Sequence, residues 1–131
     1  MIVNAARAVL SARIYGISQA AFAAIGIGTG ASGPTAADTA LGNGVTASGA
    51  ADGGVHAIPA ASVTWSSVTT AVANDTAQAV GTVTAAGALA ITESGIFNSD
   101  NGGTMLCRQV FAAVNLASGD SLQMTWRIKN A

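Results

Sequence analysis

Alternation of apolar and polar residues dominates the second half of the chain. It is clearest at 121–129, where Leu122, Met124, Trp126 and Ile128 fall on one face and polar residues on the other. This period of two predicts a half-buried strand. Similar apolar runs, each bounded by turn sequences at 74–75, 98–103 or 117–120, predict further strands at 76–84, 89–97 and 105–114.

A further β region covers residues 63–72. Val63 and Trp65 share one parity, and the alternation then continues on the opposite parity at Val68 and Val72. A change of parity within one strand is typical of a bulge, because one extra residue shifts every later side chain to the other face. The pattern therefore predicts a bulge near Ser66 and Ser67.

The beginning of the chain has a different period. Val3, Ala6, Leu10 and Ile14 are spaced by three, four and four residues, which predicts a helix over 2–15 with Gly16 as its stop. Such a short helix is marginal alone, so it packs on a sheet or docks on a neighbouring subunit. Residues 20–29 follow as a predicted buried strand.

Residues 30–54 show no periodicity and are punctuated by glycine and proline. A loop of this length in a small domain is usually functional or mobile. We therefore expect it to be the first place at which a partner makes contact.

These elements predict one domain, 1–131, that is mainly β. One short N-terminal helix and six or seven strands, with turns every 8 to 14 residues, favour a jelly-roll-like antiparallel β-sandwich. Two such sheets share one apolar layer. We expect that layer to contain Trp65, Leu89, Ile91, Phe111, Leu122, Met124 and Trp126.

Charge is scarce in this chain, at 8% of residues against about 25% in average domains. A net charge of -1 excludes broad attraction to nucleic acid. The charge-free stretches are broken by Gly, Ser and Thr, so no membrane span is expected although the mean hydropathy is +0.50. We expect a soluble, unexported protein whose weakly charged surface suits a large assembly.

Candidate chemistry is sparse. One His, one Cys and six scattered acids give no ligand spacing for a metal. Gly26 to Ala31 match a dinucleotide-binding pattern, but Ser-Gly-Pro follows where that site needs a helix, so no cofactor is expected. A hydrolase would need a serine, His56 and an acid in one pocket, and Cys107 is expected to be a buried thiol.

Three ordered runs resemble a family of small virion proteins of tailed bacteriophages. They are ITESGIFN at 91–98, GGTMLCRQVF at 102–111 and GDSLQMTW at 119–126, with IGIGTG, DTALG, TTAV and NDTA upstream. The usual form has Ala at the position of Cys107 and an Arg-containing segment around His56. The resemblance covers most of the chain in its order.

The resemblance implies a non-enzymatic capsid decoration (cement) protein with a jelly-roll-like fold. Such a protein binds the major capsid protein on the capsid exterior, self-associates as a dimer or trimer, and assembles in the host cytoplasm. The alternative is a tail-fibre or neck-associated module. No catalytic, cofactor or metal residue is expected.

Charged residues are the candidate partner contacts under both readings. Arg108 is expected to be an exposed strand charge, as are the two basic residues near the end of the chain. An exposed charge in an interface sets register and partner choice rather than affinity. The candidate contacts are Arg7, Arg13, Asp38, Asp52, Arg127 and Lys129.

Overall fold

The computed structural model describes residues 1–14, 16 and 18–129. Residue 15, the predicted end of the helix, lies outside the described residues. The strands predicted at 76–84, 89–97 and 121–129 are confirmed with the same bounds. The elements are α1 (Asn4–Ile14), β1 (Ala24–Gly28), β2 (Gly44–Val45), the 3-10 turn η1 (Ala60–Ser62), β3 (Val63–Val68), β4 (Thr76–Thr84), β5 (Leu89–Phe97), β6 (Met105–Leu116) and β7 (Ser121–Lys129).

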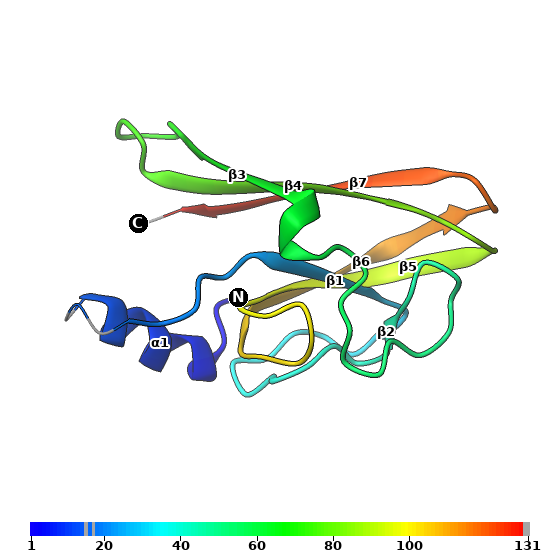
Figure 1. The fold of residues 1–131 in the computed structure, drawn as a ribbon, viewed down its shortest axis with the longest axis horizontal. Helices are drawn as coiled ribbons and strands as arrows, with labels where there is room; N and C mark the ends of the chain where they lie inside the picture. Colours follow the sequence, from blue (N-terminus) through cyan, green and yellow to red (C-terminus); the bar gives the residue numbers. More distant parts are fainter. Residues whose placement is uncertain (15, 17, 130–131) are drawn as a thin grey trace.

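The strands form two antiparallel sheets that lie one above the other (Figure 1). One sheet has the order β2-β1-β5-β6 and the other the order β3-β4-β7. The expectation of a mainly β protein with one helix is confirmed. β6 and β7 are joined by the turn at 117–120 but belong to different sheets, so the chain crosses between the layers at this turn.

The core between the sheets is aliphatic. Its largest fully buried side chains include Ile25, Ile27, Ile58, Ile91 and Ile96. β-branched residues suit this position, because their restricted side chains pack well on a pleated surface. One polar connection crosses the core: the Trp126 indole N–H on β7 donates to the Ser94 hydroxyl on β5 at 3.1 Å.

The outer face of the β2-β1-β5-β6 sheet is covered by α1 and by the chain between β1 and β3 (Figure 1). α1 packs against β6, and the N–H of Val3 donates to the carbonyl of Leu106 at 3.0 Å. Val3 and Ala6 are buried as the helical spacing predicted, but Ile14 is 83% exposed. The prediction for Ile14 was wrong, because the last turn of α1 extends beyond the sheet.

Two other local predictions were wrong. The strand predicted at 20–29 is confined to β1, because only these five residues pair with β5. The bulge predicted near Ser66 and Ser67 is absent, since β3 pairs with β4 without a register shift and ends at Val68. The irregularities lie instead in the β5–β6 pairing, between Ile91 and Glu93 and between Ile96 and Phe97.

The predicted apolar layer exists, but it is not closed. Leu89 and Ile91 are buried in the core. The other five members are only half-buried. Four of them lie on β6 and β7, which belong to different sheets and leave the interior open along that side, while Trp65 lines a pocket at the α1 end. These five are Trp65, Phe111, Leu122, Met124 and Trp126.

Candidate functional site

A buried polar cluster lies where the long loop meets the outer face of β5 and β6. Glu93 on β5 has no exposed surface, and Arg108 on β6 is 3% exposed. The Arg108 Nε–H donates to Glu93 Oε2 at 2.7 Å. The expectation that Arg108 is exposed was therefore wrong. A lone buried charge is costly, so this arginine needs the carboxylate beside it.

The Glu93 carboxylate is also the anchor of the loop. The backbone N–H groups of Gly30 and Asn43 donate to its Oε1 at 2.9 and 2.7 Å, and that of Gly42 donates to Oε2 at 2.9 Å. Charge-assisted bonds of this kind are roughly twice as strong as neutral ones. One carboxylate thus holds both the beginning and the middle of the loop against β5.

Arg108 holds the segment between these anchor points. Its Nη2–H donates to the carbonyl of Ser32 at 2.8 Å, and its Nη1–H donates to Asp38 Oδ2 at 3.0 Å. Asp38 in turn accepts hydrogen bonds from the N–H and hydroxyl of Thr35. Asp38, a candidate partner contact, is therefore engaged inside the fold. We call Asp38, Glu93 and Arg108, with the loop groups bonded to them, the loop clamp.

The clamp shifts the pKa values of its members. Burial raises the pKa of Glu93, but the N–H groups of Asn43 and Gly42, Arg108 and the N–H of Gly30 outweigh burial, so the pKa lies below its ordinary value. Burial likewise lowers the pKa of Arg108, while Glu93 and Asp38 more than compensate and raise it. The pKa of Asp38 is lowered, first by its bonds to Thr35 and further by Arg108.

Glycine is required where the loop reaches Glu93. A Cβ on Gly30 would lie 2.5 Å from Glu93 Oε1, and one on Gly28 would also overlap this carboxylate. These are glycines of the apparent dinucleotide motif. No helix follows them in residues 29–43, all of which are described, so the geometry that such a cofactor needs is missing. Here the glycines permit close approach to a carboxylate of the chain itself.

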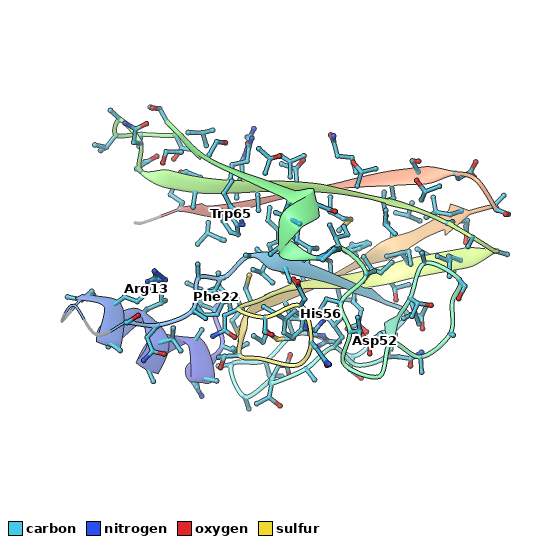
Figure 2. The ribbon with its side chains drawn as sticks, viewed as in Figure 1. Arg13, Phe22, Asp52, His56 and Trp65 are labelled. Atoms are coloured by element: carbon cyan, nitrogen blue, oxygen red, sulfur yellow. The ribbon has the colours of Figure 1, made fainter. Side chains whose placement is uncertain are left out.

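A pocket of about 190 Å³ lies beside the clamp. Asp52 and His56 line it from the chain that covers β1 and β5 (Figure 2). The His56 ring stacks on Phe97 with a centroid distance of 3.7 Å, and its Nε2 lies 2.9 Å from the carbonyl of Gly102, so Nε2 carries the proton. Among the described residues, Nδ1 has no hydrogen-bond partner.

This pocket lacks the parts of a serine or cysteine hydrolase. Thr39 contributes a hydroxyl, but no serine or cysteine is among the described residues that line it. Asp52 accepts the N–H of Gly54 and makes no hydrogen bond to His56. The hydrogen bond between acid and histidine that a catalytic triad needs is therefore not formed here. Cys107 is buried elsewhere, and burial raises its pKa to about 11.

A second pocket, of about 320 Å³, opens between the sheets at the α1 end. Phe22 and Trp65 line it, and Arg13 lies at the same end of the molecule (Figure 2). The Trp65 indole N–H is buried and has no acceptor among the described residues. Arg13 is thus a predicted contact that lies beside an apolar pocket open to solvent.

The predicted contact residues do not form one cluster. Arg7 and Arg13 are exposed on α1, Asp52 is half-buried, and Lys129 is exposed at the end of β7. Arg127 donates to the Gln78 side chain on the neighbouring β4 at 2.8 Å. Within the described part of the chain, no salt bridge joins any two of the six.

Searches against protein-family models, curated proteins and solved structures found no match. Among the described residues, no helix is long and apolar enough to cross a membrane. The same residues contain no group of three or more His, Cys, Asp or Glu side chains placed to hold a metal ion.

Sequence reasoning missed the Glu93–Arg108 pair. A signal was present in the sequence, because Glu93 and Arg108 are the two charged residues of largely apolar strands in a chain with 8% charged residues. The turn at 98–103 makes the two strands neighbours in a hairpin. Charged residues are rarely buried unless they are paired, so an ion pair between the two strands explains why both charges lie within them.

Proposed function

We propose that this chain is a structural virion protein of a tailed bacteriophage, of the capsid decoration (cement) type. The observation that carries the proposal is the ordered set of runs at 91–98, 102–111 and 119–126. Self-association and binding to the major capsid protein on the capsid exterior belong to the same proposal.

The contacts of the motif residues support a structural role. Glu93 and Arg108 bond to each other and to the loop. Asn98 Oδ1 accepts the N–H of Thr104, and Trp126 donates to Ser94. The polar residues that carry the resemblance are thus used in shaping the fold rather than in lining a reactive pocket.

The clamp also supports the binding role of the loop. Docking a mobile loop costs conformational entropy, and fixing the loop beforehand reduces that cost. Glu93 and Arg108 fix residues 30–43 from within, while residues 48–51 stay exposed at the surface. A preorganised loop of this kind suits a protein that must bind many identical lattice sites.

We also propose that the two-sheet body is a reduced jelly roll. The connections β2–β3, β4–β5 and β6–β7 all pass from one sheet to the other, as in sandwiches built from Greek keys. This arrangement supports the assignment.

The mechanism is mass action. A protein that binds the assembled lattice but not free capsid subunits stabilises the lattice by its binding free energy. Weak individual contacts are sufficient when many copies act together.

Particles stripped of this protein test the proposal. They should lose resistance to heat or to a chelator and regain it when the purified protein is added back. Unchanged resistance of the stripped particles would contradict the cement role. A tail-fibre or neck module is the second candidate, because it shares the motif runs, and its removal would leave head stability intact while reducing infectivity.

A further inference from the structure

β7 has a free edge. It lies at the end of the sheet order β3-β4-β7, and no other strand of the described chain pairs with its far side. Its pairing with β4 is unbroken over all nine residues, without proline or a bulge. Natural edge strands are normally protected by such interruptions, so an uninterrupted edge is suited to pairing with another chain.

The apolar face of β7 is only partly covered beside this edge. Leu122, Met124, Trp126 and Ile128 point toward the other sheet but remain half-buried. Two pockets adjoin them: one of about 150 Å³, lined by Phe111, Met124 and Trp126, and one of about 210 Å³, lined by Ile2, Trp126 and Ile128. An added strand would therefore gain both backbone hydrogen bonds and apolar contacts.

We propose that a second copy of this chain occupies the edge, with the two β7 strands pairing antiparallel about a two-fold axis at Thr125. The proposal deepens the self-association named in the proposed function. The dimer is tested on purified protein without capsids. Failure of the dimer and failure of the cement function can therefore be distinguished.

Register follows from the strand itself. A two-fold axis perpendicular to the sheet keeps the outer faces of the two strands on one side and their inner faces on the other. Full overlap of Ser121–Lys129 then places Thr125 of one copy opposite Thr125 of the second copy. On the inner face, Met124 then lies opposite Trp126 of the second copy, and Leu122 opposite Ile128. Every half-buried apolar residue of β7 gains an apolar neighbour.

Charges favour the same register. With Thr125 at the axis, Arg127 lies opposite the second copy's Gln123, and Lys129 opposite its Ser121. Moving the axis to Arg127 would place two guanidinium groups opposite each other, and like charges in opposite positions are destabilising. Arg127 already donates to Gln78 on β4, so Gln123 of the second copy would extend an existing polar row.

The other free edge of this sheet is a weaker candidate. β3 has six residues against nine in β7, and it begins after Pro59 and the η1 turn. A pairing through β3 would also leave the half-buried face of β7 uncovered. The occupant of the β7 edge must be long, regular and alternating, which a second β7 is.

Sedimentation of the purified chain tests the dimer. We expect a mass twice the 12.7 kDa of one chain. Thr125→Arg places two cations at the axis on an exposed position, so the dissociation constant should rise at least about tenfold. The matched control is Thr64→Arg, exposed on β3 of the same sheet, which should leave the dimer intact. A monomer at all concentrations, or equal effects of the two variants, would overturn the proposal.

Cysteine cross-linking tests the register. Thr125→Cys should form an interchain disulfide under mild oxidation, because the two thiols face each other. Gln123→Cys should not, since the two copies of residue 123 are separated by four residues, about 13 Å along the strand. Native Cys107 is buried and does not compete. Cross-linking of Gln123→Cys without that of Thr125→Cys would overturn the register.

Discussion

The Nε–H of Arg108 lies 2.7 Å from Oε2 of Glu93, and these two buried side chains connect the long loop to the sheet. The carboxylate accepts hydrogen bonds from three backbone N–H groups of the loop. The guanidinium also donates to Asp38 and to the carbonyl groups of Ser32 and Gly33. Both charges are therefore fully engaged, as buried charges must be. The pair thus binds residues 30, 32, 33, 38, 42 and 43 of the loop to the sheet.

Removal of the guanidinium should be strongly destabilising. Arg108→Met leaves the Glu93 carboxylate buried without its cation, which costs about 3–5 kcal/mol in free energy of unfolding. Urea denaturation measures the change. Arg7→Met, exposed on α1, is the matched control and should stay within about 0.5 kcal/mol of the native chain. Equal stability of both variants would mean that the clamp contributes little.

Acid should weaken the clamp. The folded pKa of Glu93 lies below its ordinary value of 4.5, so its stabilisation is complete above about pH 4.5 and is lost as the pH falls through the folded pKa. In thermal melts between pH 7 and pH 2, the melting temperature should fall as the pH drops below about 4.5. Glu93→Gln should be less stable at neutral pH and should show a shallower decline in acid. An unchanged decline in that variant would assign the acid sensitivity to other carboxylates.

Gly30→Ala should loosen the loop, because its Cβ would lie 2.5 Å from Glu93 Oε1. We expect a loss of about 1–3 kcal/mol, typical of overpacking. Gly33→Ala is the matched control, since nothing lies within 4 Å of its Cβ. Hydrogen exchange measured by NMR should show faster exchange at the Gly42 and Asn43 amides in Gly30→Ala alone. Equal exchange in both variants would contradict the role of the clamp.

Cys107 should be inert in the folded protein. It is buried, and burial raises its pKa to about 11, so little thiolate forms near pH 8. A chromogenic thiol reagent should react with the native chain far more slowly than with the chain in denaturant. Rapid reaction of the folded protein would show that the contacts of Cys107 with the N-terminal residues and β7 open readily.

Alternation was sufficient to predict β7, because one face of this strand is turned toward the core and the other is exposed. β4 and β5 were predicted from apolar runs bounded by turns, and β5 is buried on both faces over residues 93–97. It could not predict the end of β3, since the change of parity after Trp65 marks the end of the strand rather than a bulge. It also missed the clamp, because the Glu93–Arg108 contact depends on the β5–β6 register, which is shifted between Ile96 and Phe97 next to the turn. The aliphatic core can be predicted from the local pattern of apolar residues. The buried charges cannot, because their contact is determined by how β5 and β6 pair in the folded chain.

The copy number of this chain in purified virions tests the virion role most directly. Quantitative mass spectrometry against the major capsid protein should give hundreds of copies per particle, since a cement protein follows the symmetry of the whole shell. About a dozen copies would place the chain at the tail or neck, since those structures have low cyclic symmetry. Absence of the chain from purified particles would contradict the structural virion role altogether.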